Sequence, residues 1–160
     1  MADLTAEDGK KITLEALTWK GTAYALVGEQ SRKGHFGDCS GTTCAIYGAA
    51  GFNFPYQQAA NFPAWAIREG KFRKVLESET RQDGDILVWD GHMAIYSTFS
   101  TLLEAPMRTT ARVSTKTKQP WTQLNDMWTA SRPDGPAYRE SASVYFKAGA
   151  KPDAYRYFMP

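Results

Sequence analysis

The chain is organised around Gly37-Asp38-Cys39-Ser40-Gly41, a turn of small residues that leads into an apolar run with helical spacing. This pattern predicts a helix over about residues 40–50, capped by Asp38 or by Cys39. The first turn of a helix presents unpaired backbone amides and the positive end of the helix dipole. A cysteine placed there lies in a setting that favours the thiolate, which is the nucleophilic form of the side chain.

The other interpretation of this cysteine is a buried structural residue at a helix start, which is the commoner role of a lone cysteine. Cys44 lies five positions further on. At about 100° per residue the two side chains point about 140° apart, so one helix cannot join them in a disulfide. We expect Cys44 to belong to the core. No second Cys/His cluster accompanies the pair, so we expect no metal site and no cofactor.

Composition indicates a globular protein. The chain has 160 residues, of which 42% are hydrophobic and 22% charged, and its net charge is +2. We expect one domain over residues 1–160, with a core at about 15–132 and a C-terminal extension at 133–160 that packs on it. The charge is too small to indicate a nucleic-acid partner, and no apolar stretch is long enough for a membrane span.

Residues 1–8 lack the basic region and apolar core of a Sec signal peptide, so we expect synthesis in the cytoplasm. The run Thr5-Ala6-Glu7-Asp8 has the form of a capping box and predicts a first helix to about Trp19. Gly51 to Pro55 is a stop signal after the second helix. Further helices are predicted at 56–61 and 63–69. His35 lies in a polar loop and is expected at the surface.

The clearest strand signal is a hairpin, in which Asp90-Gly91 separates the apolar runs 85–89 and 92–96. A third strand is predicted at 102–105, an extended stretch at 108–117 and a last core strand at 127–131. Five aromatic residues of the tail are expected to pack back on the domain: Tyr145, Phe146, Tyr155, Tyr157 and Phe158.

His92 begins the second strand of this hairpin and, with a period of two, shares a face with Ala94 and Tyr96. If strand 102–105 pairs beside it in an even register, Glu104 projects from the same face, whereas an odd register places it on the far side. In the even register Glu104 orients the imidazole of His92 while the other ring nitrogen faces Cys39. Together these residues form the nucleophile, base and orienting acid of a thiol hydrolase.

Five stretches resemble, in order and spacing, the NlpC-type bacterial cell-wall cysteine peptidases. They are Gly21-Thr22-Ala23-Tyr24, Asp38-Cys39-Ser40-Gly41, Gly51 to Pro55, Gly84-Asp85-Ile86-Leu87 and Gly91-His92-Met93-Ala94-Ile95-Tyr96. The resemblance covers about residues 15–132. It implies an α+β, papain-like fold, in which the nucleophile helix packs on a small antiparallel β-sheet that carries the histidine.

Carried over by position, the resemblance makes Cys39 the nucleophile, His92 the general base and then acid, and Tyr24 a hydroxyl near the thiol. The family's third polar residue, often a histidine, falls on Glu104, which is a departure from its pattern. We expect Asp38 and Ser40, which flank Cys39, to contribute with Tyr24 to substrate binding and oxyanion stabilisation. Gly37 and Gly41 are expected to let the backbone approach a substrate closely.

The resemblance implies hydrolysis of peptidoglycan stem peptides, commonly between γ-D-glutamate and diaminopimelate or lysine. A short chain without a signal peptide or wall-binding repeat also resembles the amidase effectors of type VI secretion, which act in the periplasm of a target bacterium and meet a cognate immunity protein. We expect a monomer. Two other functions stay open: a catalytically silent cell-wall-binding or phage-tail module, and a thiol acyltransferase or deamidase acting on protein.

Overall fold

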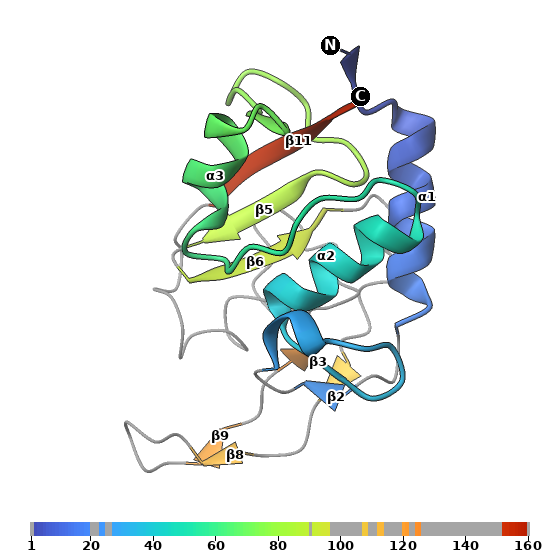
Figure 1. Ribbon diagram of the computed structural model, residues 1–160, viewed down its shortest axis with the longest axis vertical. Helices are drawn as coiled ribbons and strands as arrows, with labels where there is room; N and C mark the ends of the chain where they lie inside the picture. The colour runs from blue at the N-terminus through green and yellow to red at the C-terminus, as the bar shows by residue number, and fades with distance from the viewer. Residues whose placement is uncertain are drawn as a thin grey trace.

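The computed structural model describes residues 2–19, 23–24, 27–89, 91–96, 107–108, 112–113, 120–121, 124–125 and 152–159. At positions 23, 24 and 92, and in the short strands between 107 and 125, it describes the backbone alone. Helices pack on a five-stranded antiparallel sheet (Figure 1), so the fold is α+β and papain-like as predicted.

The sheet is assembled from strands that lie far apart in the sequence. Strand β11 (Asp153–Met159) pairs with β5 (Ile86–Trp89) on one side. It also pairs with β4 (Phe72–Lys74) on the opposite side and, near its C-terminal end, with β1 (Ala2–Asp3). The two ends of the chain therefore lie together (Figure 1). The sequence analysis did not predict a strand at 153–159, because turn-forming residues precede it and its partners are distant.

The predicted hairpin is confirmed. Strand β6 (His92–Ile95) pairs antiparallel with β5, and Trp89 lies opposite His92 across the two-residue turn. Gly91 in this turn has φ of +75°, a conformation that glycine adopts without steric cost. The Asp-Gly signal therefore fixes both the position and the register of these two strands.

Helices α1 (Ala6–Leu17), α2 (Cys39–Ala49) and α3 (Phe62–Arg68) correspond to three of the predicted helices. The Thr5 hydroxyl accepts a hydrogen bond from the Asp8 amide at 3.1 Å, as the capping box requires. At the other end of α2, the Phe52 amide donates to the Tyr47 carbonyl and the Gly51 amide to the Gly48 carbonyl, which is a Schellman motif.

The helix predicted at 56–61 is wrong. Residues 52–58 are not helical, and only a turn at 59–61 precedes α3. Phe52 and Phe54 are buried while Asn53 and Pro55 are exposed, which is the alternation of an extended segment. Burial of the two phenylalanines overrides the local helical tendency of the residues that follow.

The first core cluster fills the face of the sheet that the three helices cover. It includes Ile12 of α1, Ile46 of α2 and Phe62 of α3, together with strand residues such as Ile86 and Met93. Most of its volume is aromatic, and neighbouring rings meet edge-on or tilted with centroids 5.0–6.0 Å apart. Burial of each such side chain contributes about 1.5–3 kcal/mol, so this cluster is the principal source of stability.

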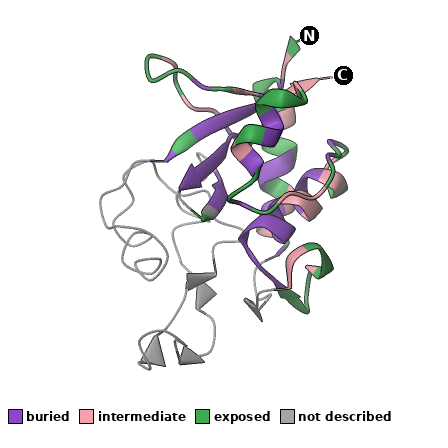
Figure 2. Cartoon of the chain, turned by 60° about the vertical axis from the view of Figure 1, so that its left-hand side comes forward, coloured by how far each residue is buried: buried purple, intermediate pink, exposed green. Residues whose placement is uncertain are grey.

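The second core cluster lies on the opposite face of the sheet. It contains Val75, Leu87, Trp89, Ala94 and Ala154, and Tyr96 packs against it. Because strand residues alternate between the two clusters, β5 is buried on both faces (Figure 2, purple).

Four short strands are described between residues 107 and 125. β7 (Met107–Arg108) pairs with β10 (Leu124–Asn125), and β8 (Arg112–Val113) pairs with β9 (Pro120–Trp121). The stretch predicted at 108–117 thus contains parts of two short strands. The predicted strands at 102–105 and 127–131, and Tyr145 and Phe146, lie outside the described residues.

Two arginines join the ends of the chain to the sheet. Arg73 on β4 donates to both carboxylate oxygens of Asp3 at 2.8 and 2.9 Å and to those of Glu79 at 2.8 and 2.7 Å. Arg156 on β11 donates to both oxygens of the fully buried Asp85 at 2.9 and 2.8 Å. The paired arginines therefore tie β1, β4 and β11 to the loop around residues 79–85.

We predict that Glu79→Gln is less stable than wild type at pH 7, and that the difference closes on acidification. Hydrogen bonds from Arg73 lower the pKa of Glu79 from its ordinary value of 4.5 to about 2. A lowered folded-state pKa contributes stability that is complete above pH 4.5 and is lost as the pH falls through about 2. Urea unfolding from pH 7 to pH 2 measures the difference.

The matched control for this measurement is Glu77→Gln, because Glu77 is exposed and makes no ion pair within the described part of the chain. Its stability should track that of wild type at every pH. A Glu79→Gln deficit that persists at pH 2, or that is absent at pH 7, contradicts the prediction.

Candidate functional site

Asp38 is the cap of α2, which decides between the two caps that the sequence left open. Its Oδ1 accepts from the Gly41 amide at 2.8 Å, and its Oδ2 accepts from the Gly28 amide at 2.5 Å. Both carboxylate oxygens are thus occupied by backbone amides of the protein. Cys39 becomes the first residue of the helix, in the position where the dipole and the free amides act.

A 3₁₀ turn, η1 (Gly28–Gln30), closes over the start of α2. The Ser31 hydroxyl donates to the Gly28 carbonyl at 2.7 Å and accepts from the Asp38 amide at 3.2 Å. A Cβ atom added at Gly41 would lie 1.9 Å from the Gly28 carbonyl oxygen and 2.2 Å from Ser31 Oγ. The close approach that Gly41 permits is therefore to η1, whereas the sequence analysis expected a close approach to a substrate.

Cys39 lies at the edge of the first core cluster, with 9% of its surface exposed. Of the first four amides of α2, the Gly41 amide is bound by the Asp38 side chain and the Thr42 amide by the Asp38 carbonyl. Within the described residues, the amides of Cys39 and Ser40 have no such acceptor. Backbone amides in this position beside a thiol can act as donors to a developing oxyanion.

Ser40 and Tyr56 form a pair of hydroxyl groups beside Cys39. Ser40 is buried, and its Oγ lies 3.0 Å from the hydroxyl oxygen of the half-buried Tyr56. Tyr56 belongs to the extended segment after α2, which turns back along the start of that helix. The sequence analysis did not single out Tyr56. The signal available was its position directly after Pro55, which indicates that the chain no longer continues helix α2 there.

The backbone of Tyr24 lies beside this turn. Strand β2 (Ala23–Tyr24) runs parallel to β3 (Phe36–Gly37), and Tyr24 is the partner of Gly37, two residues before Cys39. The pairing brings residues 23–24 next to the turn at residues 37–41, although 14 positions separate Tyr24 from Asp38 in the sequence. The side chain of Tyr24 lies outside the described part of the structure.

His92 is the first residue of β6, the strand against which α2 packs. Met93 and Ile95 join Cys39 in the first core cluster, whereas Ala94 belongs to the second. The predicted alternation therefore holds from Met93 to Ile95, and Ala94, which the sequence analysis placed on the same face as His92, lies on the face away from Cys39. A contact between His92 and Cys39 therefore stays a prediction. The side chain of His92, all of Glu104 and the register of the strand predicted at 102–105 lie outside the described residues, so the orienting role of Glu104 stays a prediction.

Cys44 and His35 are placed away from the proposed chemistry. The Cys44 thiol donates to the Phe54 carbonyl at 3.3 Å, and burial raises its pKa. It packs partly buried against the first core cluster, as predicted. His35 is exposed in the turn before β3, where its amide donates to the Arg32 carbonyl at 3.0 Å. Both cysteines are free thiols.

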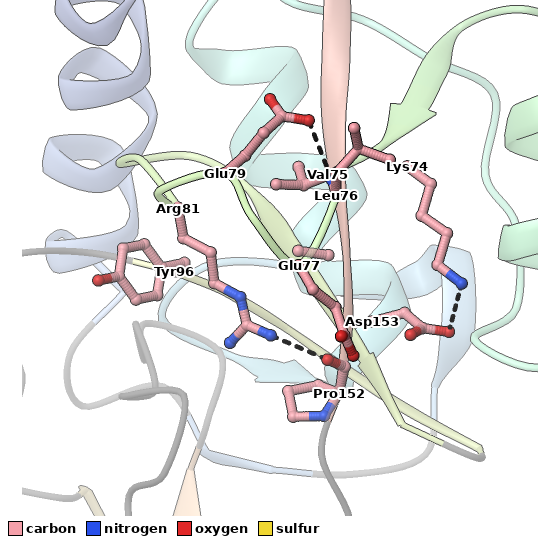
Figure 3. A pocket seen from close by; sticks show the side chains of 10 residues that line it. Lys74, Val75, Leu76, Glu77, Glu79, Arg81, Tyr96, Pro152 and Asp153 are labelled. Carbon is pink, nitrogen blue, oxygen red and sulfur yellow. Dashed lines mark hydrogen bonds and ion pairs between the residues drawn. The ribbon is translucent and has the colours of Figure 1, made fainter.

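A cavity of about 980 Å³ opens on the other side of the sheet (Figure 3). Its lining includes Val75 and Ala154 of the second core cluster, and Arg81, which donates to the Pro152 carbonyl at 2.9 Å. No predicted site residue is among its described lining residues. The described residues also contain no cluster of three or more His, Cys, Asp and Glu able to hold a metal ion.

Comparison with known families assigns the chain. The model of the NlpC/P60 family matches residues 21–130. The chain belongs to the NlpC/P60 family. The matched span contains all six predicted site residues: Tyr24, Asp38, Cys39, Ser40, His92 and Glu104. Members of this family are in general cysteine peptidases and amidases that act on peptidoglycan. No curated protein matches the chain, and none of its described helices has the length and apolar character of a membrane span.

We predict that Gly41→Ala destabilises this NlpC/P60 protein by about 2 kcal/mol or more, because the added methyl overlaps backbone atoms of η1. Gly48→Ala, in the same helix, is the matched control. There the added Cβ would meet only the Asn53 side chain, at 3.0 Å, and the gain in helix propensity of about 1 kcal/mol offsets the contact. Urea unfolding of both variants measures the difference, and equal stabilities contradict the packing described.

Proposed function

We propose that the protein is a cysteine hydrolase that cleaves amide bonds in peptidoglycan stem peptides. The observation that carries the proposal is the start of α2, where Cys39 opens the helix behind the Asp38 cap. The amides of Cys39 and Ser40, which have no acceptor among the described residues, accompany the thiol there. A nucleophile and oxyanion donors on one rigid helix terminus are what acyl transfer requires.

In the proposed reaction the Cys39 thiolate attacks the carbonyl carbon of the stem-peptide amide. The amides of Cys39 and Ser40 stabilise the negative charge on the carbonyl oxygen. His92 takes the proton of the thiol and then protonates the leaving amine, which produces a thioester. Water activated by His92 hydrolyses the thioester, releasing the acid and restoring the thiol. Each proton thus passes through His92.

The roles of the remaining predicted residues rest on the family resemblance. Glu104 holds one imidazole nitrogen of His92 if its strand pairs in the even register. Tyr24 supplies a hydroxyl near the thiol, and the pairing of its backbone with Gly37 supports this assignment. Asp38 contributes by capping α2, which fixes the position of Cys39, and Ser40 contributes through its amide and hydroxyl.

The finer proposal names the bond, the setting and the partners. The bond is the one between γ-D-glutamate and diaminopimelate, which members of this family commonly cleave. The protein is secreted, acts as a monomeric antibacterial effector in the periplasm of a target bacterium, and is inhibited by a cognate immunity protein.

We predict that wild type releases a new amine terminus from purified sacculi, and that Cys39→Ala lowers this activity by about 10⁴-fold or more. Mass spectrometry of the stem fragments identifies the bond. Cys44→Ala is the matched control, because the Cys44 thiol bonds the Phe54 carbonyl, and it retains cleavage. Cleavage by Cys39→Ala at the wild-type rate contradicts the mechanism. Binding without cleavage by wild type indicates a silent wall-binding module, and activity on protein alone indicates an acyltransferase or deamidase.

Thiol reactivity provides a second prediction, in which exposure and activation give opposite results. Cys39 is buried and Cys44 is only partly buried, so exposure alone predicts faster alkylation of Cys44. If the helix terminus and His92 activate Cys39, iodoacetamide labels it about tenfold faster or more at pH 7, while burial raises the pKa of Cys44 and slows its labelling. Peptide mass spectrometry after timed labelling distinguishes the two. Faster labelling of Cys44 counts against activation.

A further inference from the structure

We propose that Tyr56 is a positioning residue of the active site, which acts through the Ser40 hydroxyl and directs its proton toward an acceptor oxygen of the substrate. The inference rests on the proposed function and extends it to a residue that lies outside the Asp-Cys-Ser-Gly turn. Its basis is the hydroxyl pair at the start of α2, where the Ser40 and Tyr56 oxygens lie 3.0 Å apart.

The surroundings of Tyr56 hold its hydroxyl in a narrow position. A Cβ atom added at Gly28 would lie only 3.2 Å from the Tyr56 hydroxyl oxygen, so this oxygen lies between η1 and α2. Burial, and to a smaller extent the neighbouring Asp38 and Cys39, raise the pKa of Tyr56. The phenol therefore keeps its proton at neutral pH and serves as a hydrogen-bond donor.

The two hydroxyls carry two protons, and their mutual hydrogen bond uses one of them. A phenol is the more acidic donor, so the favoured arrangement has Tyr56 donating to Ser40 Oγ. The Ser40 proton is then free to donate elsewhere. Thr43, one turn further along α2, shows the contrasting case, because its hydroxyl donates to the Cys39 carbonyl at 2.8 Å and its proton is used within the helix.

Ser40 lies in the first turn, where the residues three and four positions before it belong to β3 and not to the helix. Helical back-bonding of the kind made by Thr43 is therefore not available to it. With Tyr56 as donor, the Ser40 hydroxyl keeps its own proton for another hydrogen bond beside Cys39. In the proposed complex its acceptor is a carbonyl or carboxylate oxygen of the stem peptide. Removal of the Tyr56 hydroxyl lets the serine rotate and weakens this contact.

The test is a double-mutant cycle on a purified muropeptide with Tyr56→Phe, Ser40→Ala and the double variant. Loss of one hydrogen bond to substrate lowers kcat/KM about tenfold. We expect such a loss in each single variant, and no further loss when Tyr56→Phe is added to Ser40→Ala, because Tyr56 acts through Ser40. Tyr157→Phe, which removes a hydroxyl bonded to the Asn53 carbonyl at 3.3 Å, is the matched control and keeps the wild-type kcat/KM.

Thermal unfolding of each variant separates a role in the site from a role in folding. A Tyr56→Phe variant with wild-type kcat/KM overturns the inference and leaves the proposed function intact. Additive losses in the double variant also overturn it, because Tyr56 then acts independently of Ser40. If wild type cleaves no muropeptide, the proposed function fails and this inference fails with it.

Discussion

The bridge that Asp38 makes between the Gly28 and Gly41 amides is the interaction on which the rest of the site depends. The Asp38 carboxylate caps the start of α2 and holds η1 against that helix. Because α2 packs on β6, this single side chain also sets the distance between the nucleophile turn and the strand that begins with His92. The cap of α2 therefore also places Cys39, and the absence of a side chain at Gly41 is the condition that permits both.

Aromatic packing between α2 and the sheet also holds this helix in place. Tyr47 of α2 is fully buried among Phe54, Phe72 and Tyr157, and its hydroxyl donates to the Gly84 carbonyl. Burial raises the pKa of this phenol, so it stays neutral in the core. The aromatic contacts fix the middle of the helix while the Asp38 cap fixes its start. In the proposed reaction, a thiol on a helix that is fixed at its start and its middle loses little conformational freedom on meeting a substrate, which is the basis of preorganised catalysis.

Local signals in the sequence were enough for the capped helices, the Asp-Gly hairpin and the position of Cys39 at a helix terminus. Each depends on residues fewer than about six positions apart, where propensity and turn chemistry act directly. The extended path of residues 52–58, the hydroxyl pair and strand β11 could not be predicted this way, because distant contacts decide them. Burial in the core, and not the residues beside it in the sequence, decides the conformation of Phe54. Tyr56 contacts Ser40, which lies 16 positions earlier in the sequence. The partners of His92 depend on a register that no local pattern specifies.

The placement of β11 has a consequence for how the protein is made. This strand pairs with β1, β4 and β5, yet the ribosome synthesises it after every other described element. Until it emerges, β1 and β4 lack their partner and Arg156 cannot reach Asp85. Such long-range pairing gives the fold a high contact order and delays its final step. The sheet is thus completed only after residues 153–159 have been synthesised, so a nascent chain carries Cys39 on α2 before the finished sheet lies beneath it.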